Sequence, residues 1–211
     1  MHDVGHLRVD VAAVEPDASI AAWWPGNGHQ REIVRGGHDF EFYNGVGYAT
    51  GQVSEGFRFN VSGNFARTPA HEDFAVGSSA EGFTVEFWVK RDAIIDSRLF
   101  VWRSSSGADR MMGMFNGAGN NFQVWVPRVG EGGNGGSAST TIGTISTGVW
   151  HHLVATFDRP TRTLRLYVDG QLASAETVLG DGTPDTPTNG YLYLGSTPED
   201  TRFRGMIDEF T

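Results

Sequence analysis

The 211-residue chain contains no cysteine. This absence excludes disulfide bonds, thiolate metal sites and a cysteine nucleophile. No apolar run approaches the ~18 residues that a membrane-spanning helix needs, so we expect no membrane insertion. Basic residues are also scarce, with 16 lysines and arginines against 25 aspartates and glutamates, which leaves a net charge of −9. Because an acidic surface repels a phosphate backbone and no basic stripe is present, the sequence predicts no nucleic-acid partner.

Helical patterning is missing as well. No window of eleven residues keeps apolar side chains on one helix face together with capping residues. The chain has instead 29 glycines and 12% aromatic residues. Glycine destabilises helices but suits tight turns, and each buried aromatic ring removes roughly 150–250 Å² from water. The composition therefore favours many short strands around an aromatic core.

Alternation of apolar and polar residues is clearest at residues 83–90 (FTVEFWVK), where every second side chain is apolar. Residues 149–157 (VWHHLVATF) are apolar on both faces along most of their length, which is typical of a strand inside a sheet. Residues 162–168 lead into Asp169-Gly170, a dipeptide that favours a two-residue hairpin, and residues 171–176 follow. Further strands are predicted at 40–43, 57–60, 64–68, 98–103, 111–116, 121–127, 140–145, 191–195 and 203–210.

About a dozen strands without helices predict an all-β fold, a two-sheet antiparallel sandwich. We interpret residues 1–18 as a lead-in or linker and residues 19–211 as one domain. Residues 130–137 and 180–189, which are rich in glycine and polar residues, are predicted loops at the rim. The N-terminus lacks the pattern of a signal peptide. Two alternatives therefore remain: an intracellular protein, or a module of a longer exported chain.

Four segments occur in an informative order: residues 22–28 (AWWPGNG), 83–90 (FTVEFWVK), 150–170 (WHHLVATFD to LYVDG) and 192–210 (LYLG to FRGMIDEF). Over roughly residues 19–211 they resemble the laminin-G-like, concanavalin A-like lectin/glucanase domains of bacterial surface and secreted proteins. The resemblance implies a jelly roll with a convex and a concave sheet. It also implies carbohydrate or protein ligands at the concave face or rim loops, and an extracellular or cell-surface location.

The same resemblance implies a structural calcium ion at Asp208, which lies in the segment MIDEF. In relatives, a carboxylate at this position ligates calcium together with backbone carbonyls. Calcium takes 6–8 oxygen ligands, and we expect the Gly26 carbonyl and the Asn60 side chain to contribute. The alternative is that Asp208 only forms hydrogen bonds to a turn.

Hydrolytic chemistry is not expected. Glycosidases need two carboxylates about 5–9.5 Å apart. Glucanases of the resembled fold place them as Glu-x-Asp-x-x-Glu on one strand, whereas Glu86 stands alone on its predicted strand. His151 and His152 are neighbours on a strand, so they point to opposite faces and cannot share a metal ion. We predict structural roles for both, and no enzyme activity.

Two tryptophans are candidate ligand contacts, Trp102 and Trp125, because the C–H groups of sugars stack on aromatic ring faces. The alternative is that both are buried in the sandwich. Arg103, Arg110 and Asn116 lie near them in the sequence and are candidate hydrogen-bond partners.

The sequence therefore predicts a non-catalytic binding or adhesion module of a larger exported protein, with a glycan as the leading ligand and a cell-surface protein as the other partner class. The main alternative is a structural spacer or protein-interaction domain without a small-molecule site. A glycoside hydrolase is the least favoured function.

Overall fold

A computed structural model of the chain describes residues 16–61, 63–118, 120–130, 135–141, 143–174, 177–178, 180–199 and 203–211. Within these ranges, no helix has the length and hydropathy needed to cross a bilayer. Residues 1–15, most of the predicted lead-in, lie outside the described ranges.

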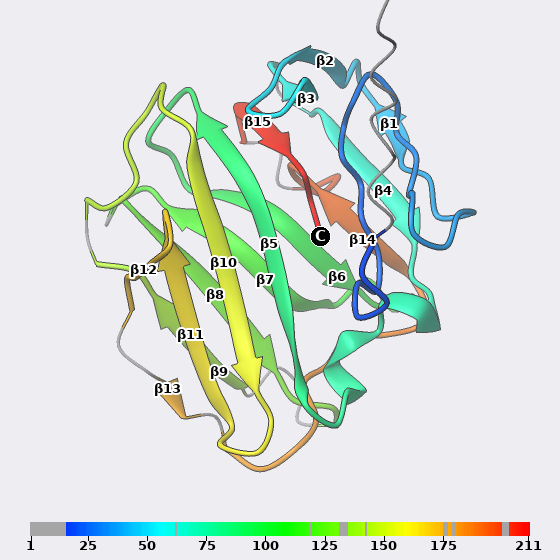
Figure 1. Cartoon of the computed structure of the whole chain (residues 1–211), viewed down its shortest axis with the longest axis vertical. Helices are drawn as coiled ribbons and strands as arrows, with labels where there is room; N and C mark the ends of the chain where they lie inside the picture. Colours follow the sequence, from blue (N-terminus) through cyan, green and yellow to red (C-terminus); the bar gives the residue numbers. More distant parts are fainter. Residues whose placement is uncertain are drawn as a thin grey trace, which may run out of the picture.

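Two antiparallel sheets pack face to face (Figure 1). The first sheet has the order β1 (Glu41–Tyr43), β4 (Phe65–Pro69), β14 (Tyr191–Leu194), β6 (Ser97–Arg103), β7 (Asp109–Asn116), β8 (Asn121–Pro127) and β9 (Gly135–Ser139). The second has the order β12 (Gln171–Leu172), β11 (Thr163–Val168), β10 (His151–Asp158), β5 (Gly82–Arg91), β15 (Gly205–Asp208), β3 (Glu55–Phe59) and β2 (Gly47–Thr50), with β13 (Thr177–Val178) paired to β11.

Helical structure in the described residues is limited to two 3₁₀ turns, η1 (Glu72–Phe74) and η2 (Val76–Ser78). Many neighbouring strands are far apart in sequence, such as β4 beside β14 and β5 beside β15. The predicted all-β jelly-roll sandwich is therefore confirmed. The predicted hairpin also forms, because Asp169 and Gly170 both adopt positive φ between β11 and β12.

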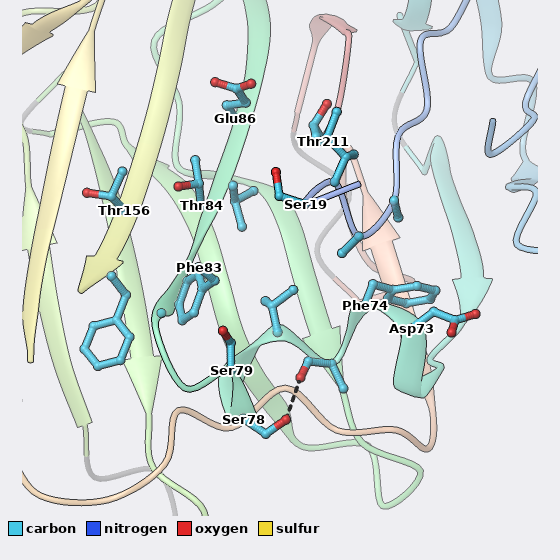
Figure 2. A pocket seen from close by; sticks show the side chains of 18 of the residues that line it. Ser19, Asp73, Phe74, Ser78, Ser79, Phe83, Thr84, Glu86, Thr156 and Thr211 are labelled. Carbon is cyan, nitrogen blue, oxygen red and sulfur yellow. Dashed lines mark hydrogen bonds between the residues drawn. The ribbon is translucent and has the colours of Figure 1, made fainter. Parts of the chain in front are cut away.

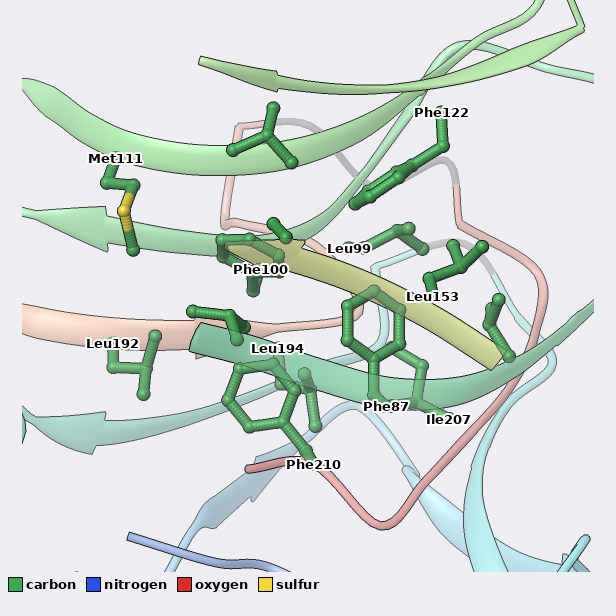
Figure 3. Packing of buried hydrophobic residues seen from close by; sticks show 14 of the residues in the cluster. Phe87, Leu99, Phe100, Met111, Phe122, Leu153, Leu192, Leu194, Ile207 and Phe210 are labelled. Atoms are coloured by element: carbon green, nitrogen blue, oxygen red, sulfur yellow. The ribbon is translucent and has the colours of Figure 1, made fainter. Parts of the chain in front are cut away.

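Every second side chain of β5 is buried and points into the core between the two sheets. The ring of Phe87 lies 5.9 Å from Phe100 and 6.0 Å from Phe122 of the first sheet, in edge-to-face geometry. It also lies 5.8 Å from Phe210 near the C-terminus, and Leu153 of β10 packs in the same layer (Figure 3). Such ring pairs contribute about 0.5–1.5 kcal/mol beyond their buried area. The aromatic core predicted from composition is thus the contact that joins the two sheets.

The predicted strand assignments differ from the structure in three places. Residues 135–139 form edge strand β9 although the glycine-rich composition predicts a loop there, because the backbone pairs with β8 without needing apolar side chains. The strand expected at 140–145 is reduced, in the described residues, to a single bridge between Thr140 and Ser174. Strand β2 is not predicted, since its four residues are too short to show a period.

Candidate functional site

One row of side chains crosses the outer face of the first sheet. This face is turned away from the core, because Trp125 alternates along β8 with the buried residues Val124 and Val126. Cross-strand pairing aligns the row across β8, β7, β6, β14, β4 and β1, in the order Trp125, Met112, Val101, Tyr193, Arg67 and Glu41. Together with Tyr43, Arg103, Asp109 and Tyr191, we call this row the Tyr–Arg face.

Arg67 is the centre of the Tyr–Arg face. Its guanidinium carbon lies 4.7 Å from the ring centroid of Tyr43 and 4.1 Å from that of Tyr191. Its Nε donates to Glu41 Oε2 at 3.1 Å. Tyr43 in turn stacks on Phe65 at 4.6 Å with nearly parallel rings. Because a cation held over two rings and bonded to a carboxylate has little rotamer freedom left, both tyrosines are held in fixed orientations.

Arg103 has an equivalent set of contacts, two strands away from Arg67. Its Nε donates to Asp109 Oδ1 at 2.6 Å, and its guanidinium lies 5.6 Å from the centroid of Tyr193. It also donates to Glu199, while Arg98 bonds the second oxygen of Asp109 at 3.0 Å. Burial lowers the pKa of Arg103, but the hydrogen bonds to Asp109 and Glu199 outweigh it and raise the pKa overall. The charge is therefore permanent.

Each of these arginines has a carboxylate partner, and Arg110 repeats the pattern with Asp185 at 2.7 Å. The surface is consequently close to neutral, although the chain carries a net charge of −9. Of the predicted hydrogen-bonding residues, Arg103 lies at the end of β6 and Arg110 at the start of the neighbouring strand β7. Asn116 faces the same side at the opposite end of β7, about 20 Å from Arg110 at the usual rise of a strand.

The two candidate tryptophans have different environments. Trp125 is half-buried in the Tyr–Arg face. Trp102 is only 3% exposed and packs edge-on against Phe100, 5.8 Å away, inside the core. The two rings therefore lie on opposite sides of the first sheet, and one ligand cannot contact both. For Trp102, the alternative that the ring is buried in the sandwich is therefore the one that the structure shows.

A cleft of about 780 Å³ opens between residues 19–24 and β5, beside η1 and η2. Thr84, Glu86 and Thr156 lie along it on the outer side of the second sheet (Figure 2). Its apolar lining includes the core rings Phe83 and Trp102, each at most 9% exposed. Rings buried this deeply offer a sugar little surface to stack on.

The last two residues of the chain, Phe210 and Thr211, line the cleft. Trp24 pairs with Phe210 on one side, and Glu86 pairs with Thr211 on the other. Two of its carboxylates have a lowered pKa. A hydrogen bond from His38 is the largest cause for Asp73, and the backbone N–H of Thr161 is the largest cause for Asp158. A general acid needs the opposite shift, so neither carboxylate suits that role.

Asp208 lies fully buried beneath the turn that joins β2 and β3. Its Oδ2 accepts hydrogen bonds from the backbone N–H groups of Gln52 and Val53, at 2.9 and 2.8 Å. Its Oδ1 has no hydrogen-bond partner among the residues that the structure describes. Burial raises the pKa of Asp208, although the backbone N–H groups of Val53, Gln52 and, least strongly, Glu209 act to lower it. An ionised carboxylate with one free buried oxygen suits a hard cation such as calcium.

The expected partners of Asp208 are only partly brought together. Gly26 packs against Gly56, since a Cβ on Gly26 would lie 3.2 Å from the Gly56 Cα, and Gly56 packs against Asp208. Asn60 is four residues further along, beyond the other end of β3, about 13 Å from Gly56. The expectation that Asn60 ligates the same ion as Asp208 is therefore wrong. The strand register, which single-sequence patterning does not reveal, separates them.

His151 forms a chain of contacts that resembles a catalytic triad. Its Nε2 lies 2.8 Å from Ser146 Oγ, and its Nδ1 lies 2.8 Å from Asp169 Oδ2. The Ser146 backbone N–H also donates to the same Nε2, at 3.2 Å. That N–H is thus not free to stabilise an oxyanion, as a serine nucleophile requires. The imidazole instead connects a loop to the β11–β12 turn, which agrees with the predicted structural role.

His152 lies on the outer face of the second sheet, as the strand geometry predicts. Its ring lies 4.9 Å from that of Trp88, and its Nε2 is 3.6 Å from Glu86 Oε2.

Sequence patterning did not identify Tyr43, Arg67 and Tyr191 as site residues. Their only sequence signal is the position of large polar side chains between core residues.

Comparison with known proteins agrees with this architecture. No curated protein matches the chain. Among solved structures, domain 4 of AbnA, an extracellular arabinanase of Geobacillus stearothermophilus in complex with arabinotriose, has a TM-score of 0.58 at 19% identity, covering 90% of this chain and 89% of that one. The sialidase of Trypanosoma rangeli has a TM-score of 0.63 at 19% identity, covering 94% of this chain and 31% of that one.

A third similar structure is the ligand-binding domain of botulinum neurotoxin serotype D in complex with N-acetylneuraminic acid. Its TM-score is 0.61 at 14% identity, and the match covers 90% of this chain and 46% of that one. At these identities the likeness shows the fold alone.

A family model described as the concanavalin A-like lectin/glucanases superfamily matches residues 60–211. The chain therefore belongs to the concanavalin A-like lectin/glucanase superfamily, in its laminin-G-like branch.

Proposed function

We propose that this protein is a non-catalytic module that binds a neutral oligosaccharide on the Tyr–Arg face, as a module of a larger protein that acts outside the cell. The observation that carries the proposal is Arg67, held between Tyr43 and Tyr191 on the side of the sheet that faces away from the core. The sandwich core does not need these side chains, because the apolar residues of the same strands already fill it.

The chemistry of the face matches that of a sugar. The half-buried rings of Tyr191 and Trp125 offer surface to the C–H face of a pyranose or furanose ring, whereas Tyr193 is only 5% exposed. Tyr43 already stacks on Phe65 and carries Arg67 over its ring. The arginine–carboxylate pairs supply charged donors and acceptors for hydroxyl groups, and such bonds are stronger than neutral ones. Because Arg67, Arg103 and Arg110 are each paired with a carboxylate, a neutral sugar is favoured over an anionic one. The arabinotriose complex of a structurally similar domain supports this class of ligand.

A glycan array with neutral and sialylated oligosaccharides, followed by calorimetry on the best ligand, tests the proposal. Arg67→Ala and Tyr191→Ala should each weaken binding by ~10–30-fold or more, because truncating a central arginine or aromatic anchor typically has an effect of this size. Arg58→Ala is the matched control, since Arg58 forms an equivalent ion pair with Asp92 on the other sheet, at 2.7 Å.

Three results would contradict the proposal. The first is the absence of neutral-glycan binding in the presence of calcium. The second is an equal loss of affinity in the control and the test variants, and the third is preferential binding of sialylated sugars. The first would favour a spacer or protein-interaction domain instead.

We also propose that Asp208 binds a structural calcium ion through its free Oδ1. What supports this is a fully buried carboxylate oxygen without a hydrogen-bond partner in the described residues, next to the backbone of Gly56, against which Gly26 packs. The ion would supply the positive charge that this desolvated carboxylate lacks, and backbone carbonyls would complete its shell of oxygen ligands.

A further inference from the structure

Two histidines and an aspartate meet at η1, where Asp73 also borders the cleft described above. His38 precedes β1, His71 is the N-cap of η1, and Asp73 lies within that turn. His38 Nε2 is 2.8 Å from Asp73 Oδ2, and His71 Nδ1 is 3.1 Å from the same oxygen. The ligand atoms of the three side chains all lie within 4.8 Å of one another.

The surroundings hold this group in place. The Trp24 indole N–H donates to the His38 carbonyl at 2.8 Å. The His38 ring lies 4.5 Å from the His71 ring, tilted by 39°, and 5.2 Å from the Phe74 ring in edge-to-face geometry. The His38 side chain is only 13% exposed, whereas His71 and Asp73 are open enough for an ion to enter. Figure 2 shows Asp73 beside Phe74, at the outer edge of η1.

The separations suit a small divalent cation. In a tetrahedral zinc site with bonds of about 2.0–2.2 Å, neighbouring ligand atoms lie about 3.3 Å apart. Both histidine–aspartate distances are within about half an ångström of that value. The His71 Nδ1 lone pair accepts the backbone N–H of Asp73 at 3.2 Å, so a bound ion would replace this hydrogen bond. We propose that His38, His71 and Asp73 form a binding site for zinc or a similar first-row divalent cation, with a fourth position open to water.

The local charges are compatible with this site. A hydrogen bond from His38 is the largest cause that lowers the pKa of Asp73, so the carboxylate is ionised at neutral pH. Neutral imidazole and carboxylate are ordinary ligands of zinc. The positive charge of Arg35 also acts on Asp73. It opposes a second cation, which makes this a site of moderate affinity. A bound ion would cross-link the loop before β1 to η1.

Calorimetric titration of the full chain with zinc chloride, in buffer containing calcium, tests the proposal. We expect one zinc ion per chain at this site. At a free zinc concentration about 100 times Kd, the melting temperature should rise by about 5–11 °C. His38→Gln keeps a hydrogen-bond donor to Asp73 but removes the ligand. His71→Asn keeps an N-cap side chain but removes the other ligand.

The control variants address the histidines His2, His6 and His29. His29→Ala and the double variant His2→Ala/His6→Ala should keep the zinc effect, whereas His38→Gln and His71→Asn should each weaken binding at least tenfold. The proposal would be overturned by the absence of zinc binding, or by binding that both ligand variants retain. Melting curves without metal show whether each variant still folds, so loss of fold is distinguished from loss of the site.

Discussion

Glu32 offers a quantitative test of how the N-terminal segment is held on the sandwich. Its side chain is 3% exposed. Oε1 accepts hydrogen bonds from the backbone N–H groups of Trp23 and Val34, at 3.0 and 2.7 Å. Oε2 accepts from Arg35 and Gly36, at 2.8 and 2.7 Å. One carboxylate therefore satisfies four backbone donors that belong to two separate stretches of the chain.

Glu32→Gln keeps one acceptor oxygen and places an NH₂ group opposite the other two donors. Each hydrogen bond to a charged group contributes about 1.5–3 kcal/mol, and an unsatisfied buried N–H has a similar cost. Relaxation of the exposed residues around Arg35 recovers some of this loss. We expect a destabilisation of about 2–4 kcal/mol, which lowers the melting temperature of a chain of this size by roughly 5–12 °C.

The effect should depend on pH. Burial alone raises the pKa of Glu32, but the four backbone donors outweigh it, so the folded pKa lies below the ordinary value of 4.5. The unfolded state then binds more protons, and the stabilisation is complete above pH 4.5 and lost as pH falls through the folded pKa. Urea denaturation of both proteins at about pH 7 and about pH 3 measures this. A variant as stable as the parent at neutral pH, or an equal difference at both pH values, would refute the reasoning.

Four further predictions concern the calcium site, the triad-like contact and the core. Calcium should raise the melting temperature relative to a chelator, and Asp208→Asn should abolish the rise; an unchanged melting temperature in the parent argues against the ion. Without calcium, the raised pKa of Asp208 means that stability falls as pH rises from the unfolded pKa through the folded one, and the asparagine variant should lack this component. A fluorophosphonate should not label Ser146, as judged by intact mass; stoichiometric labelling would contradict the structural role of His151. Phe87→Ala should destabilise the fold by about 3–5 kcal/mol in urea denaturation, and a loss below about 1 kcal/mol would contradict its central place in the core.

The sequence alone was sufficient for the architecture. Alternation at 83–90 identified β5 and its inward ring Phe87, because a side-chain period of two is a property of the strand itself. The Asp169-Gly170 hairpin was predictable for a similar reason, since the preference for positive φ is local to those two residues. Strand β9 was missed, because an edge strand of small residues carries no apolar period.

Tertiary structure decided every proposed site. Tyr43, Arg67 and Tyr191 meet only because β1, β4 and β14 are neighbours, although long connections separate them in sequence. The same kind of non-local pairing separates Asn60 from Asp208. It is also tertiary packing that brings His38 to His71. Local patterning reports which face a side chain occupies, whereas the order and register of strands depend on the free energy of packing the whole sandwich.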